Sequence, residues 1–141
     1  FDKDDTVFIG EYREGEALTS VDTGDRHFSG YFGKLLGSRI SVDGYGAFAA
    51  RQTGRFWESI ANGCLVMYQT IKPYEWNNPF IDDEHFISYS DTDELIEKSC
   101  YYVGSPDKAE EIARKGYEHA LGFHTTTHRA NEFLLLCDRY L

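Results

Sequence analysis

The segment that most constrains the fold of this chain is a run of five residues, from Cys64 to Tyr68. The run is almost entirely apolar and directly follows Asn62-Gly63, a pair that favours the end of a helix. A strand with apolar side chains on both faces must be covered on both faces, which is typical of the interior of a parallel sheet. The run therefore predicts helices on either side of a sheet.

Strand and helix patterns alternate along the rest of the chain. Further strands are predicted at 6–10, 39–44 and 86–89, and irregular segments at 11–30 and 72–84. Helices are predicted at 31–36, at 55–62 with Thr53 as N-cap, at 92–103, at 106–121, and from Thr125 or Thr126 onward. Strands that alternate with helices imply right-handed crossovers. We therefore predict an α/β fold, a Rossmann-like three-layer sandwich with a short, mostly parallel sheet and a helical C-terminal end.

Each of the three C-terminal helices carries an apolar stripe that we expect to face the core. A capping box of Asp91 and Glu94 starts the first, and Ser105-Pro106 opens the second. The expected inward residues are Leu95, Ile96, Ser99, Cys100 and Val103 in the first helix, Ala109, Ile112, Ala113, Tyr117, Ala120 and Leu121 in the second, and Ala130, Phe133, Leu134, Cys137 and Leu141 in the last.

Composition limits the classes of function. The 141 residues suffice for one domain, and a hydrophobic content of 41% excludes an intrinsically disordered chain. A formal net charge of -10 repels phosphate backbones, so nucleic acid is not an expected partner. No apolar run approaches the roughly 18 residues that a membrane span requires.

Two further features concern the cellular compartment and the extent of the protein. Three widely spaced cysteines, Cys64, Cys100 and Cys137, form neither a metal motif nor a disulfide framework and favour a reducing compartment, the cytoplasm. The chain starts at Phe1 rather than at a methionine, which predicts a fragment of a longer protein.

One segment has the parts of an anion site. A loop of Gly and Ala, which includes Gly46, leads from the predicted strand at 39–44 to the N-terminus of the helix at 55–62. Arg51 and Arg55 flank that terminus, Thr53 adds a hydroxyl, and free helix N–H groups favour a negative charge. A diphosphate would suit such a site. The alternative is that the loop only permits tight packing, because it matches no phosphate-binding motif.

Two other groups of residues admit alternative interpretations. Glu58 could accept hydrogen bonds from ribose hydroxyls, or it could instead be paired with Arg55 or Arg51 or stabilised by the helix dipole. His124 and His128 have a spacing that can present two metal ligands, with His119 and His85 elsewhere. Hydrogen-bonded or solvated histidines are the favoured interpretation, because the helix is expected to start after His124.

Several segments together resemble a known family. The segment 54–66, GRFWESIANGCLV, resembles the donor-site helix and following strand of GT-B-type glycosyltransferases. The segments 85–89, 93–98 and 113–118 are similar to the end of group-1 glycosyltransferases of the spore-maturation type. The segments 41–44 and 74–76 resemble the capsule-associated and protein O-glucosyltransferase branch. The likeness covers about residue 37 to the C-terminus.

The resemblance implies a nucleotide-sugar-dependent transferase, with residues 1–141 forming the single donor-binding domain of a longer two-domain enzyme. Arg55 would contact the donor diphosphate, with Arg51 as a second ligand, and the loop from Gly46 through Thr53 to Gly54 would line the site. Glu58 would hold the ribose hydroxyls. UDP is the expected leaving group and no metal is expected, because cationic side chains and the helix terminus stabilise the diphosphate.

Two departures from the family pattern limit these expectations. Ala50 stands where many retaining members carry another Glu, so the contacts to the donor sugar and the stereochemistry stay open. The resemblance implies that this chain lacks the usual N-terminal acceptor domain, so the isolated chain is expected to need a partner domain or subunit to transfer sugar to its acceptor, a sugar or a protein. Two other functions are considered: a non-catalytic interaction module that retains the fold, and a metal-dependent hydrolase built on the histidines.

Overall fold

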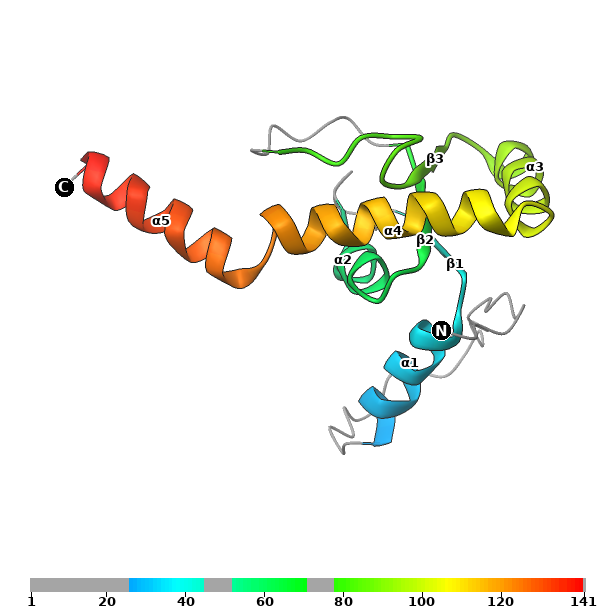
Figure 1. Ribbon diagram of the computed structural model, residues 1–141, viewed down its shortest axis with the longest axis horizontal. Coiled ribbons are helices and arrows are strands. Elements are labelled where there is room, and N and C mark those ends of the chain that lie inside the picture. The colour runs from blue at the N-terminus through cyan, green and yellow to red at the C-terminus, as the bar shows by residue number, and fades with distance from the viewer. Residues whose placement is uncertain (1–25, 45–51, 71–77, 141) are drawn as a thin grey trace, which may run out of the picture.

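The computed structural model describes residues 26–44, 52–70 and 78–140, which form an α/β structure (Figure 1). In chain order the elements are α1 (Arg26–Gly37), β1 (Ile40–Asp43), α2 (Gly54–Ala61), β2 (Leu65–Gln69), β3 (Ile87–Tyr89), α3 (Thr92–Val103), α4 (Pro106–Phe123) and α5 (Thr126–Tyr140).

The three strands form one parallel sheet in the order β1-β2-β3. Ile40 of β1 lies opposite Leu65 of β2, and Met67 of β2 lies opposite Ile87 of β3. The central strand β2 is buried from Leu65 to Tyr68, as its apolar sequence predicts.

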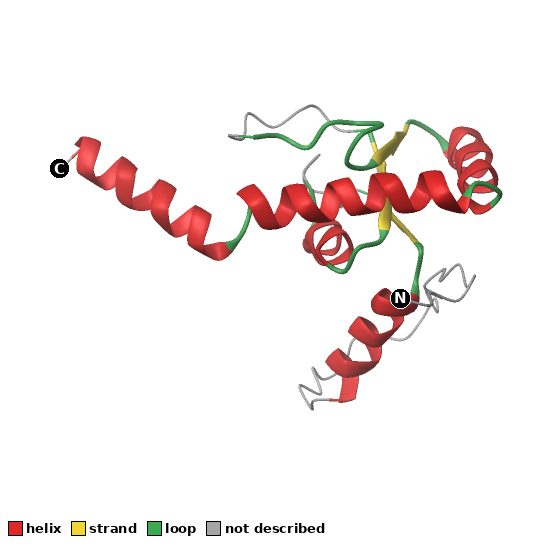
Figure 2. Cartoon of the chain, in the orientation of Figure 1, coloured by secondary structure: helices red, strands yellow, loops and turns green. Residues whose placement is uncertain are grey.

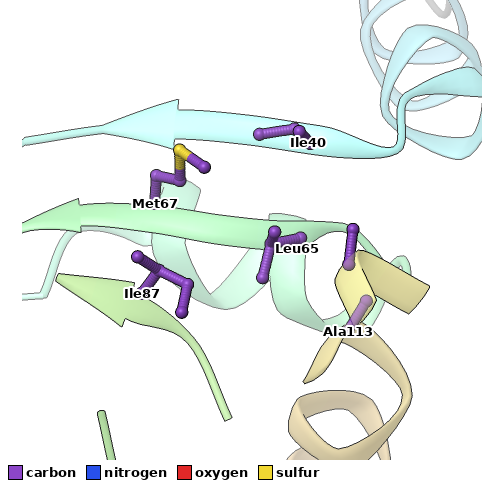
Figure 3. Close-up of a cluster of buried hydrophobic side chains, with 6 residues drawn as sticks. Ile40, Leu65, Met67, Ile87 and Ala113 are labelled. Carbon is purple, nitrogen blue, oxygen red and sulfur yellow. The ribbon is translucent and has the colours of Figure 1, made fainter. Parts of the chain in front are cut away.

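Side chains of β2 alternate between two hydrophobic clusters, one on each face of the sheet. Leu65 and Met67 enter the first cluster with Ile40 and Ile87, and Ala113 of α4 lies beside Leu65 (Figure 3). The second cluster contains Val66, Tyr68, Phe56, Ile60 and Ala120.

Helices cover both faces of the sheet (Figure 2). Helix α2 supplies Phe56 and Ile60 to one cluster, while α3 packs Leu95 and Tyr102 against the other. Helix α4 contributes to both clusters, through Ala113 toward its start and Ala120 toward its end. The predicted Rossmann-like α/β fold with a parallel sheet and a helical C-terminal end is therefore confirmed.

The predicted start and stop signals of the helices are confirmed at several positions. Thr53 is the N-cap of α2, and Gly63 follows that helix with a φ of 71°, a conformation that glycine adopts at little cost. The carboxylate of Asp91 caps α3 by accepting the N–H of Glu94 at 2.9 Å. The Glu94 carboxylate accepts the N–H of Ser90 at 2.7 Å, one residue before the partner that a capping box would use.

Helix α1 differs from its prediction because it begins at Arg26, within the segment that was expected to be a loop up to residue 30. Helix α4 also extends past Gly122 to Phe123. An isolated Gly raises the free energy of a helix by only about 1 kcal/mol, which neighbouring residues can offset.

The prediction for the inward face of helix α3 is confirmed in part, at Leu95 and Ser99. Leu95, Ser99 and Tyr102 face inward, whereas Ile96, Cys100 and Val103 are exposed. The Ser99 hydroxyl lies 3.4 Å from the sulfur of Met67. Near the end of the helix, Tyr102 rather than Val103 packs against the core.

Helix α5 contradicts its prediction more fully, because none of its residues is buried. Phe133 and Leu134, expected to face inward, are 65% and 58% exposed. After His124 the chain turns, and α5 runs away from the sheet (Figure 1). The prediction assumed that α5 folds back on the core. At the end of α4, Tyr117 and Leu121 are likewise exposed.

Some predictions lie outside the described residues. They are the strand at 6–10, the irregular segments at 11–25 and 72–77, the residues 45–51 that include Gly46, Ala50 and Arg51, and Leu141. In the part of the chain that the structure describes, no helix is long and apolar enough to cross a membrane.

The close approach of α4 to the sheet gives a prediction at Gly116. A Cβ at this position would lie far inside van der Waals contact with the carbonyl oxygen of His85 and 3.0 Å from Cδ1 of Ile60. The backbone at His85 cannot move away without disturbing the sheet. We therefore expect Gly116→Ala to lower the free energy of unfolding by about 2 to 3 kcal/mol.

The matched control lies on the same helix. A Cβ at Gly122 meets nothing within 4 Å, so Gly122→Ala should raise stability by up to about 1 kcal/mol through helix propensity. Urea denaturation of both variants measures the two effects. Equal stability of Gly116→Ala and the parent chain would contradict the packing of α4 against His85.

Candidate functional site

A buried carboxylate marks the carboxyl edge of the sheet. Asp43 is the last residue of β1 and is buried, and its Oδ1 accepts the N–H of Gly44 at 2.9 Å. Its Oδ2 accepts a hydrogen bond from the hydroxyl of Thr53. A buried carboxylate must be hydrogen-bonded to be tolerated, so these donors hold the end of β1 against the start of α2.

Thr53 joins three parts of this edge. Its hydroxyl donates to Asp43 and accepts the N–H of Phe56 at 3.4 Å, while its own N–H donates to the hydroxyl of Tyr68 at 3.1 Å. Both polar groups are thus engaged by the protein. Thr53, predicted as a diphosphate ligand, acts in this structure as the helix cap and as the donor to Asp43.

Two tyrosines complete the edge. The hydroxyl of Tyr89, at the end of β3, donates to the carbonyl oxygen of Asp43 at 2.9 Å. Burial raises the pKa of Tyr89 and of Tyr68, and the charge of Asp43 raises both further. Both hydroxyls therefore stay protonated at neutral pH, and the ends of the three strands are connected by hydrogen bonds.

Arg55, the principal predicted diphosphate ligand, lies on the first turn of α2 and points largely into solvent. Its side chain is 60% exposed, and its Nη1 lies 3.8 Å from Oδ1 of Asp43, too far for a hydrogen bond. Gly54, another predicted ligand, is exposed beside it. The N–H groups of Gly54 and Arg55 have no acceptor among residues 26–44, 52–70 and 78–140. This helix terminus presents positive charge and unpaired donors together.

Glu58, the predicted ribose ligand, lies one turn further along α2. One carboxylate oxygen, Oε2, accepts the hydroxyl of Tyr31 of α1 at 2.8 Å. Burial and the bond to Glu58 raise the pKa of Tyr31 to about 12, although the charge of Arg55 lowers it. The alternative in which Glu58 pairs with Arg55 is not what the structure has, since its partner here is Tyr31.

The remaining predicted ligands, Arg51 and Gly46, lie outside the described residues. Conversely, Asp43, Tyr68, Tyr89 and Tyr31 were not predicted as site residues. The position of Asp43 as the polar end of a buried strand was a usable signal, since ligands of parallel sheets bind at that edge. No comparable signal pointed to Tyr31, because the sequence does not show where α1 packs relative to the sheet and α2.

Three histidines gather on the other side of α2. The rings of His85 and His119 stack with centroids 4.1 Å apart, and the ring of His124 lies 5.2 Å from that of His119. Nε2 of His119 and Nε2 of His124 both donate to the carbonyl oxygen of Asn78, at 3.0 and 2.8 Å. The cluster packs on Trp57, whose ring lies 5.3 Å from that of His124.

Hydrogen bonding fixes the protonation state of two of these rings. Nδ1 of His85 accepts the N–H of Ile81 at 2.9 Å, and Nδ1 of His124 accepts from the Arg129 guanidinium at 2.9 Å. A ring nitrogen that accepts a hydrogen bond carries no proton, so His85 and His124 are neutral.

Among the described residues, the positions of the histidines do not support the hypothesis of a metal site. Helix α5 begins at Thr126, so His124 and His128 do not share a helix face, and Nδ1 of His128 lies 2.8 Å from the Thr125 hydroxyl. Within the described ranges, no three His, Cys, Asp or Glu residues come together as a metal site would require.

The neutral histidines make stability depend on pH. Burial lowers the pKa of His85 and of His124, whereas in the unfolded chain histidine takes up a proton near pH 6.5. Below that pH the unfolded state binds more protons than the folded state, so stability is lost as the pH falls. We expect a lower Tm at pH 5.5 than at pH 7.5.

Histidine variants test which side chains cause this dependence of the Tm on pH. His85→Gln and His124→Gln should reduce the difference in Tm between the two pH values, whereas His128→Gln, outside the cluster, should leave it unchanged. Glu94 does not contribute in this window, because its bonds to Lys98 and Ser90 hold its pKa at about 2 and its effect begins only below about pH 4.5. A parent chain with equal Tm at pH 5.5 and 7.5 would refute the assignment.

Comparison with known proteins gives a match to a family model. Residues 37–135 match a family model described as glycosyl transferase-like. This range includes β1, α2 and the whole sheet, but begins after Tyr31. No curated protein and no solved structure matches the chain.

Proposed function

The chain belongs to the glycosyl transferase-like family, and on this premise we propose that it is the donor-binding domain of a glycosyltransferase that uses a nucleoside diphosphate sugar. The observation that carries the proposal is the exposed Arg55 guanidinium beside two N–H groups at the start of α2 that find no acceptor in the described part of the chain. This arrangement lies at the carboxyl edge of a parallel sheet, where ligands of such folds bind.

The diphosphate is the part of the donor that this terminus suits. Arg55 offers a forked set of N–H donors to phosphate oxygens, and the N–H groups of Gly54 and Arg55 add neutral donors along the helix axis. When the sugar is transferred, negative charge develops on the departing diphosphate, and these fixed donors would stabilise it without a metal. Arg51 and Gly46 would complete the site, and Thr53 would hold the helix start in place.

Glu58 would bind the ribose. Residues three apart on a helix are neighbours on its surface, so Arg55 and Glu58 lie on the same side of α2. A nucleotide that places its diphosphate at Arg55 therefore brings its ribose within reach of a carboxylate, which accepts hydrogen bonds from hydroxyls. UDP is the proposed leaving group, in keeping with the resemblance to the spore-maturation and protein O-glucosyltransferase branches.

The proposal extends to the rest of the enzyme. A second domain or a partner subunit would bind the acceptor, a sugar or a protein, and the isolated chain would bind donor without transferring sugar. Cys64, Cys100 and Cys137 form no disulfide among the described residues, which fits a reducing, cytoplasmic compartment.

An interaction module that retains the fold is the second candidate. The observation that favours it is the exposed apolar surface of α5, formed by Phe133, Leu134, Leu135, Leu136 and Tyr140. That reading also expects Arg55 to be neutralised by its surroundings. The 60% exposed guanidinium, with its long contact to Asp43, fits the donor-binding function better.

Titration with UDP tests the proposed function. We expect UDP to bind and to raise the Tm, and Arg55→Ala to weaken UDP binding about 10- to 100-fold, because hydrogen bonds to charged groups contribute about 1.5–3 kcal/mol. Arg114→Ala is the matched control, since Arg114 is an exposed arginine of α4 that pairs with Glu118 at 3.0 Å. Calorimetry that detects no UDP binding at millimolar concentration would reject the donor-binding function.

Gly54 provides a test of where the diphosphate lies. A Cβ at Gly54 meets nothing within 4 Å in the protein, so Gly54→Ala should leave the Tm of the ligand-free chain equal or slightly higher. If the diphosphate approaches this backbone closely, the added methyl group should weaken UDP binding by about tenfold. Unchanged affinity would place the phosphates away from Gly54.

A further inference from the structure

We propose that Tyr31 is a positioning residue of the donor site, which holds the Glu58 carboxylate in the orientation that accepts both ribose hydroxyls. The inference rests on the proposed role of Glu58. It adds a residue of a second helix, α1, to the site, and it predicts that the site prefers ribonucleotides. The ligand would be a ribonucleoside diphosphate with free 2′ and 3′ hydroxyls.

The geometry that carries the inference is the bond between the two side chains. The Tyr31 hydroxyl lies 2.8 Å from Oε2 of Glu58, and both side chains are only half-buried. The bond therefore lies at the surface of α2 that also bears Arg55, where a ligand can reach it. Because the pKa of Tyr31 is raised to about 12, its hydroxyl remains a donor at any physiological pH.

Helix α1 is anchored well enough to hold a side chain in place. Leu35 lies one turn beyond Tyr31 and is buried. The thiol of Cys64, just before β2, points at the carbonyl oxygens of Leu35 and Ser38, at 3.2 and 3.4 Å. The ring of Phe32 packs edge-on against that of Tyr31, with centroids 5.2 Å apart. Tyr31 is thus held from the sheet side as well as by its neighbour.

The chemistry explains why Glu58 needs such a partner. The last torsion of a glutamate side chain is broad, so an unrestrained carboxylate rotates almost freely. One bond from Tyr31 fixes its plane and uses one of about four acceptor positions. Among the described residues, the remaining position on Oε2 and both positions on Oε1 receive no hydrogen bond, which leaves them to hydroxyl donors. Two adjacent ribose hydroxyls match a carboxylate held in this way.

A purely structural role is the competing explanation. Tyr31 could serve only to dock α1 on α2, in which case its loss would affect every ligand of the site equally. A positioning role predicts instead that the loss is confined to ligands that carry the hydroxyls. The family match starts at residue 37, so neither role follows from membership of the family.

The experiment compares UDP with 2′,3′-dideoxy-UDP on Tyr31→Phe, which keeps the ring and removes the hydroxyl. We expect the parent chain to bind UDP more tightly than the dideoxy compound. Tyr31→Phe should weaken UDP binding about three- to tenfold and leave binding of the dideoxy compound unchanged. Tyr140→Phe, at a 79% exposed position on α5, is the matched control and should change neither affinity.

A double-variant cycle gives a second measurement. If Tyr31 acts through Glu58, adding Tyr31→Phe to Glu58→Ala should weaken UDP binding no further than Glu58→Ala alone. Additive losses would overturn the inference, as would Tyr31→Phe affecting both ligands equally or neither. Failure of the parent chain to bind UDP would instead reject the proposed function, on which the inference depends, so the two failures are distinguishable.

Discussion

The hydrogen-bonded carboxylate of Asp43 is the interaction on which the described site depends. A buried charge without partners would be strongly destabilising, so the Gly44 N–H and the Thr53 hydroxyl must be in place for β1 to end where it does. The Thr53 bond in turn fixes the first turn of α2 relative to the sheet. Because α2 carries both Arg55 and Glu58, the hydrogen bond between Thr53 and Asp43 also sets where these two residues lie.

The site and the histidine cluster use two sides of the same short helix. Arg55 lies near Asp43 at the carboxyl edge of the sheet and Glu58 contacts α1, while Trp57 packs on the ring of His124 at the end of α4. Helix α2 is only eight residues long and would be marginal alone, so its position is imposed by these neighbours and by the burial of Phe56 and Ile60. The geometry of the proposed donor site therefore depends on packing from both sides of α2.

Local signals predicted the fold better than they predicted the packing of its outer parts. The apolar run of β2, the cap at Thr53 and the stop at Gly63 are encoded within a few residues, and each of them was predicted correctly. The exposed stripe of α5 was not, because the periodicity around Phe133 shows that a helix is amphipathic but not whether the chain turns back to cover it. Arg55 and Glu58 were chosen as candidate donor-binding residues with the help of the resemblance to glycosyltransferases. Tyr31 was missed because its contact spans 27 residues of sequence.

The partnership between Tyr31 and Glu58 has a consequence for where this domain should be considered to begin. Similarity to the family starts at residue 37, and a boundary drawn there would retain every strand of the sheet and all of α2. It would also remove the phenol that donates a hydrogen bond to the Glu58 carboxylate, together with the buried Leu35 of the same helix. If Tyr31 positions Glu58 as proposed, a chain cut at that boundary would keep the strands of the sheet and lose the preference for a ribose that carries both hydroxyls.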